Sequence, residues 1–168
     1  MRFERFLTDN ARRLGGKTAL VASGRRLSYA DLDTLSDRLA AGLASAGVKR
    51  NDRVLVFMDN CWEAAVAIFA TLKAGATFSV INASTKADRL TFIVGDCEPA
   101  AILTRAKLAP IAIEARARLG LDAILVASTA AAGGATPKGA ASFEALLETQ
   151  AAPLVHGGID VDLAMLIY

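Results

Sequence analysis

Four short apolar stretches that alternate with helix-like stretches constrain the fold of this chain most strongly. The stretches "RVLVFM", "TFSVI", "AAILT" and "DAILVA" are mostly apolar on both faces, which is typical of strands buried between two layers. Helical patterns separate them, at residues 60–74, 86–94 and 107–119. Because crossovers between parallel strands are right-handed, this order predicts an α/β fold: a mostly parallel, doubly wound sheet flanked by helices.

The first fifty residues follow a different pattern. Residues 2–14 predict an amphipathic helix, and residues 17–28 predict a hairpin that turns at Ser23 and Gly24. Ser28 is a good N-cap, with Asp31 three residues later, for a helix that ends at Gly47.

Residues 128–168 contain a predicted linker and a predicted strand. Residues 128–141 are rich in Ala, Gly, Thr and Pro, and this composition favours a flexible connection. The stretch "GGATPKGA" inside it lacks the order of a phosphate loop, so the linker interpretation is preferred. The chain closes with "IDVDLAMLIY", which predicts a buried strand ending at Tyr168.

Composition limits the classes of function. The 168 residues are 54% hydrophobic, enough for one domain with a core, and a formal charge of +2 argues against nucleic acid or an anionic membrane as partner. The N-terminus has no apolar core of a signal peptide, and no transmembrane segment is expected. Cys61 and Cys97 lack metal-ligand spacing and are expected to be buried free thiols, which suggests a cytoplasmic location.

Three ordered motifs resemble a known enzyme family. "LSYADLD", "GVKRNDRVLVFMDNCWEAAVAIFATLKAGATFSVIN" and "TKADRLTFIVGDCEPAAILT" are similar to the opening third of the AMP-forming acyl-CoA synthetases, within the wider adenylate-forming family. "DLAMLIY" resembles the strand that leads into that family's phosphate loop. The resemblance implies an N-terminal fragment truncated before that loop. Residues 1–50 would pack partly on a missing second subdomain, and residues 51–168 would form an α/β subdomain.

The resemblance also implies an activity for the parent enzyme. A fatty or aromatic carboxylic acid would react with ATP to give acyl-AMP, and then with coenzyme A to give a thioester, with Mg²⁺ as the metal. The fragment itself is expected to be inactive, to bind no cofactor, and to contain no catalytic or metal-binding residue. Tyr168 and Asn82 would border the binding site, because ligands gather where parallel strands end. Exposed apolar surface is expected to cause self-association.

Other polar residues have structural interpretations at this stage. Lys73 would bond free carbonyls at a helix end, Asn60 would cap a helix, and His156 would lie in a surface loop. Four basic residues are interpreted as mainly solvated charges: Arg50, Arg53, Lys86 and Arg89. Two alternatives stay open, a stand-alone non-catalytic α/β interaction module and a flavodoxin-like domain that binds a small ligand.

Overall fold

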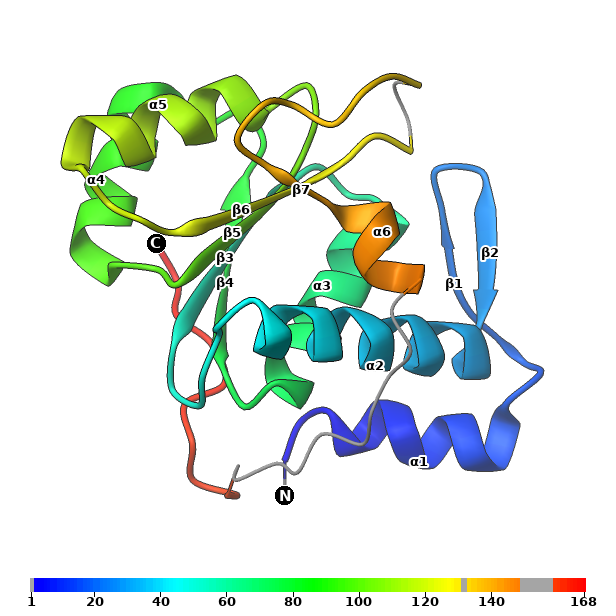
Figure 1. Cartoon of the computed structure of the whole chain (residues 1–168). Helices are drawn as coiled ribbons and strands as arrows, with labels where there is room; N and C mark the ends of the chain where they lie inside the picture. The colour runs from blue at the N-terminus through cyan, green and yellow to red at the C-terminus, as the bar shows by residue number, and fades with distance from the viewer. Residues whose placement is uncertain (1, 131–132, 149–158) are drawn as a thin grey trace.

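The structure is a computed structural model that describes residues 2–130, 133–148 and 159–168. Its centre is a parallel sheet of five strands in the order β4-β3-β5-β6-β7 (Figure 1). The bounds of these strands are β3 (Arg53–Met58), β4 (Thr77–Asn82), β5 (Ala101–Arg105), β6 (Ile124–Ser128) and β7 (Ala141–Ser142).

Helices cover both faces of this sheet, as the sequence predicts. On one face lie α2 (Tyr29–Ser45) and α3 (Trp62–Lys73), and on the other lie α4 (Ala87–Cys97) and α5 (Ala109–Leu119) (Figure 1). Strand β3 needs a helical layer on each face. Its residues Val54 and Val56 belong to the core beneath α2 and α3. Its alternate residues Leu55 and Phe57 join the core beneath α4 and α5. A strand with apolar side chains on both faces is stable only between two layers.

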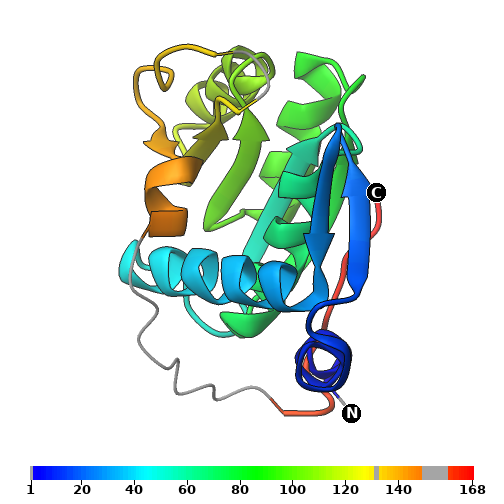
Figure 2. The same cartoon turned by 90° about the vertical axis from the view of Figure 1, so that its right-hand side faces the viewer.

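The N-terminal elements also agree with their prediction. Helix α1 (Arg5–Leu14) lies outside α2, and the antiparallel hairpin of β1 (Thr18–Ala22) and β2 (Arg25–Ser28) precedes α2 (Figure 2). The Ser28 side chain accepts a bond from the Asp31 N–H at 3.1 Å, and the Asp31 carboxylate accepts one from the Ser28 N–H at 2.9 Å. Both bonds of a capping box are therefore present at the start of α2.

Lys73 does not bond the end of its own helix, so that prediction was wrong. Its side chain is only 5% exposed. Its Nζ instead donates to α2, at 2.9 Å to the backbone oxygen of Asp33 and at 2.6 Å to a carboxylate oxygen of each of Asp33 and Asp37. The correct partners were not predictable from the local sequence, because they come from a helix about forty residues earlier.

Residues 159–168 also differ from the prediction of a buried strand. They run parallel to β4 with a single bridge between Phe78 and Met165. The side chains of Leu163 and Ile167 are 58% and 82% exposed. The segment lies beyond β4, at the edge of the sheet, where the described residues give it a neighbouring strand on one side only (Figure 1).

Smaller predictions had mixed outcomes. Asn60 is not a cap, because α3 begins one residue later than expected and its N-cap is Cys61. Cys61 and Cys97 are buried free thiols, as predicted.

The two ends of the predicted linker belong to β6 and β7. Ser142 precedes α6 (Phe143–Glu148), and its hydroxyl accepts a bond from the Ala145 N–H at 3.2 Å. Within the described residues, no helix combines the length and the apolarity that crossing a membrane requires.

Candidate functional site

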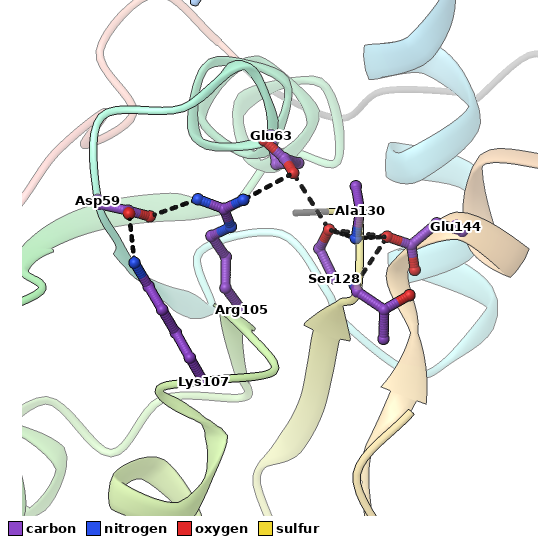
Figure 3. A network of polar contacts seen from close by, with 8 residues as sticks. Asp59, Glu63, Arg105, Lys107, Ser128, Ala130 and Glu144 are labelled. Atoms are coloured by element: carbon purple, nitrogen blue, oxygen red, sulfur yellow. Dashed lines mark hydrogen bonds and ion pairs between the residues drawn. The ribbon is translucent and has the colours of Figure 1, made fainter. Parts of the chain in front are cut away.

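Polar side chains meet where β3, β5 and β6 end. These strands are parallel and in register, so their carboxyl ends lie at one edge of the sheet. Asp59 follows β3, while Arg105 and Ser128 are the last residues of β5 and β6. Glu63 from α3 and Glu144 from α6 complete the group (Figure 3). In open α/β sheets this edge is where ligands bind, so the group is a candidate site.

Asp59 is held between two cations. Its Oδ1 accepts a bond from Arg105 Nη1 at 3.0 Å, and its Oδ2 accepts one from Lys107 Nζ at 2.6 Å. These bonds, that of Lys107 foremost, lower the pKa of Asp59 to about 2, against a smaller opposing effect of burial. Asp59 is therefore an anion at neutral pH, and it fixes the positions of both cations.

Glu63 is the most buried member of the group. It lies in the first turn of α3, where the helix dipole favours negative charge, and its side chain is 1% exposed. Its Oε1 lies 3.9 Å from Arg105 Nη2 and 3.2 Å from the Ser128 hydroxyl oxygen. Its Oε2 has no hydrogen-bond partner among the described residues. Glu63 thus has the least complete set of polar contacts in the group.

Glu144 fixes the loop that follows β6. Its Oε1 accepts bonds from the backbone N–H groups of Thr129 and Ala130, at 2.9 and 3.1 Å, and lies 2.7 Å from the Ser128 hydroxyl. Burial would raise the pKa of Glu144, but the bond from Ser128 and the backbone bonds lower it below its ordinary value. Because Ser128 has one hydroxyl proton, it cannot donate to Glu63 and Glu144 at the same time.

The charged side chains of this site form ion pairs with one another. The cations Arg105 and Lys107 each bond Asp59, and Arg105 also lies near Glu63. Among the described residues, no group of three or more His, Cys, Asp or Glu side chains is arranged to hold a metal ion. Asp59 is already bonded by two cations and Glu144 by two backbone N–H groups, so these two carboxylates do not by themselves fit Mg²⁺, and their bonds hold the loops at the sheet edge in place.

The two predicted binding residues have structural partners. Asn82 Oδ1 accepts bonds from the backbone N–H and the hydroxyl of Ser84, both at 2.8 Å, which makes a turn after β4. The Tyr168 hydroxyl donates to Asp96 Oδ2 at 2.7 Å, and this bond is the main reason why the pKa of Tyr168 is raised. These bonds do not join the two residues into one site. Their role in ligand binding stays a prediction.

Of the four basic residues predicted to be mainly solvated, Arg50, Lys86 and Arg89 are exposed, whereas Arg53 is half-buried. Arg50 makes an ion pair with Asp162, and Arg53 donates to the backbone oxygens of Cys97 and Glu98, at 2.7 and 2.9 Å. The guanidinium of Arg89 lies 5.5 Å from the ring centroid of Phe92. Lys86 is the N-cap residue of α4. The predicted surface position of His156 lies outside the described residues.

Sequence analysis missed the members of the sheet-edge group. A usable signal existed for three of them, since Asp59, Arg105 and Ser128 occur where apolar strands end. Glu63 had a weaker signal, as a charge inside an otherwise apolar helix. Nothing in the sequence indicates that Glu144 reaches this edge, because its position depends on how the chain returns after residues 131–132.

Comparison with known proteins gives a consistent family assignment. The family described as AMP-binding enzyme matches residues 7–168. The chain is 32% identical over 122 residues to a long-chain-fatty-acid–CoA ligase of Bacillus subtilis, which covers 73% of this chain and 22% of that protein. It is 44% identical over 70 residues to triostin synthetase I of Streptomyces triostinicus, covering 42% of this chain and 13% of that protein.

Solved structures share the fold. A benzoate CoA ligase from Burkholderia xenovorans LB400 superposes with a TM-score of 0.82 at 22% identity, over 98% of this chain and 32% of that structure. The chain therefore has the fold found in a CoA ligase, and it spans about a third of that ligase's length.

Proposed function

Because the chain belongs to the AMP-binding enzyme family, we propose that it is the N-terminal portion of an AMP-forming acyl-CoA synthetase. The observation that carries this proposal is the family match, which runs through almost the whole chain and includes all the motifs in their expected order. The identity to a long-chain-fatty-acid–CoA ligase over 73% of the chain supports the choice of a CoA ligase.

The proposed parent reaction has two steps. A carboxylate attacks the α-phosphate of ATP and releases pyrophosphate, and the thiol of coenzyme A then displaces AMP from the acyl-AMP to form a thioester. The first step brings two anions together, so it needs Mg²⁺ and fixed hydrogen-bond donors that offset their charge. The substrate we propose is a fatty or aromatic carboxylic acid, and the proposed location is the cytoplasm.

The chain itself would contribute a scaffold to this reaction. Its cations at the sheet edge, Arg105 and Lys107, already bond Asp59 and do not form an open cluster for a triphosphate. Loss of a single oxyanion-type donor costs about 3 kcal/mol of transition-state stabilisation, which is a hundredfold in rate. We therefore propose that these 168 residues are inactive alone, and that Tyr168 and Asn82 border the ligand site of a longer enzyme.

An adenylation domain of a peptide synthetase is the second candidate function. The observation that favours it is the 44% identity to triostin synthetase I, although over only 70 residues. Both candidates would activate a carboxylate with ATP, but they differ in the thiol that accepts the acyl group. The acceptor is coenzyme A in one case and a carrier-protein thiol in the other.

The test begins with the codons that follow Tyr168 in the source gene. If they continue into a Ser-, Thr- and Gly-rich stretch, the longer product should be purified and assayed with fatty, aromatic and amino acids, ATP, Mg²⁺ and coenzyme A. Formation of an acyl-CoA supports the proposal. Activation of amino acids without formation of a coenzyme A thioester supports the second candidate. A natural stop codon after Tyr168 would favour a non-catalytic interaction module.

A further inference from the structure

Residues 159–168 are attached to the sheet without being buried by it. The side chains of Val161 and Ile167 are 84% and 82% exposed. A groove of about 230 Å³ lies between the first part of this segment and the start of α1, with Phe3, Leu72 and Ala164 among its lining residues. Apart from Leu166, which packs against the core beneath α4 and α5, apolar side chains therefore contribute little to fixing this segment, and its polar contacts should largely determine its position.

Backbone bonds hold the middle of the segment against β4. The Phe78 N–H donates to the Ala164 oxygen at 3.0 Å, and the Leu166 N–H donates to the Phe78 oxygen at 3.0 Å. The Thr77 hydroxyl donates to the Leu163 oxygen at 2.8 Å. Backbone bonds of this kind are the same for any sequence, so a shift of two residues along β4 could re-form them. They do not select one register.

A two-point ion pair holds the beginning of the segment. Arg50 Nε and Nη2 donate to the two carboxylate oxygens of Asp162, at 2.9 and 2.7 Å. The same carboxylate accepts a bond from the Ile159 N–H at 2.9 Å, so it also shapes the turn that opens the segment. The Asn51 N–H donates to the Gly75 oxygen at 2.9 Å and anchors the loop that carries Arg50 next to β4.

A side-chain hydrogen bond and an apolar contact help to hold the end of the segment. The Tyr168 hydroxyl reaches Asp96 in α4 at 2.7 Å, and Leu166 packs against the core beneath α4 and α5. A slip of two residues would move each side chain by about 7 Å, since a strand rises by about 3.3 Å per residue. The contacts of Asp162 with Arg50 and of Tyr168 with Asp96 would then be lost, although the backbone bonds to β4 could re-form.

We propose that Arg50 and Asp96 are positioning residues, which set the register of residues 159–168 on β4 by bonding Asp162 and Tyr168. The consequence for catalysis rests on the proposed function, because the sequence resemblance places a phosphate loop immediately after this segment. In that enzyme, the register of the segment would decide where the loop begins relative to the sheet.

The test uses nuclear magnetic resonance on the isotope-labelled 168-residue chain and does not depend on catalysis. Arg50→Ala, Asp162→Asn and Tyr168→Phe should each accelerate hydrogen exchange of the Leu166 amide at least about threefold. The amide of Val56, in the central strand β3, should be unaffected. Asp162→Asn should also shift the Arg50 Nε–H resonance, a signature that general loosening does not produce.

Two matched variants control for charge and for the lost hydroxyl. Lys49→Ala removes the basic residue next to Arg50. Tyr29→Phe removes the hydroxyl of a tyrosine that packs against the core beneath α2 and α3. Neither should change Leu166 exchange. The proposal is wrong if Arg50→Ala and Tyr168→Phe leave Leu166 protection intact, or if Leu166 and Val56 lose protection to the same extent. Failure to find ligase activity in a longer protein would refute the proposed function and leave this result unchanged.

Discussion

Replacing Lys73 by methionine tests the ion pairs that join the end of α3 to α2. The variant keeps most of the side-chain volume but removes the ammonium that bonds Asp33 and Asp37. Breaking a buried ion pair costs about 3–5 kcal/mol, because it leaves a buried charge without a partner. The Asp37 side chain is 51% exposed and can be rehydrated, whereas that of Asp33 is 18% exposed. We therefore expect a loss at the low end, about 3 kcal/mol.

The assay is urea unfolding followed by tryptophan fluorescence and circular dichroism. Trp62 is the single tryptophan, is 6% exposed and is the first residue of α3, so it reports the unfolding of the helix that ends at Lys73. With a urea slope of about 2 kcal/mol/M, the midpoint should fall by about 1.5 M.

Lys107→Met is the matched control, because the Lys107 side chain is 57% exposed and bonds one carboxylate. It should cost less than about 1 kcal/mol. Adding Asp33→Asn to Lys73→Met should recover part of the loss, because it neutralises a carboxylate that would keep only the Thr8 hydroxyl, at 3.0 Å, as a side-chain partner. If Lys73→Met costs no more than Lys107→Met, the reasoning about this ion pair is refuted.

Three further predictions concern ionisation and surface. The pKa of Asp59 is about 2, below its usual 3.8, so its contribution to stability is present above pH 3.8 and is lost as the pH falls towards 2. Lys107→Met should raise that pKa in a carboxyl-carbon titration, and an unchanged midpoint would contradict the assignment. Burial raises the pKa of Cys61 to about 11, so a thiol reagent at pH 8 should label it only after unfolding. Rapid labelling of the folded protein would be inconsistent with that burial. Ile167 is 82% exposed, and light scattering should show concentration-dependent association that Ile167→Lys reduces, whereas a monomer at all concentrations would exclude it.

The layered fold was predictable because its signals are local. Strands β3, β5 and β6 are largely apolar on both faces, and such strands fit between two helical layers. The capping box at Ser28 and Asp31 needed only a spacing of three residues. For such features, residues that are close together in the sequence determine the local structure.

The final segment shows where an apolar pattern is ambiguous. "DLAMLIY" reads as a buried strand, because a run of apolar residues does not indicate how many neighbours the strand will have. Its position beyond β4 leaves its other side without a strand from the described part of the chain, and Met165 and Ile167 are exposed. The number of neighbouring strands is a property of topology and is not encoded in seven residues.

The candidate site was predictable only in part, for the same reason. Strand ends indicate where Asp59 and Arg105 emerge, but not that they bond each other at 3.0 Å. The contact of Glu144 with Ser128 depends on how the chain folds back over sixteen residues. Tyr168 and Asn82 were selected by their position at strand ends, and the structure adds their partners, Asp96 and Ser84.

Carboxylate-dependent exchange of pyrophosphate into ATP is the most direct test of the proposal that these residues supply a scaffold without the activating groups. The purified 168-residue chain, with Mg²⁺ and a panel of fatty and aromatic acids, should show no exchange above the level without protein. A longer product that continues through the phosphate loop we propose after Tyr168 should show this exchange. Exchange by the 168 residues alone would contradict the proposal.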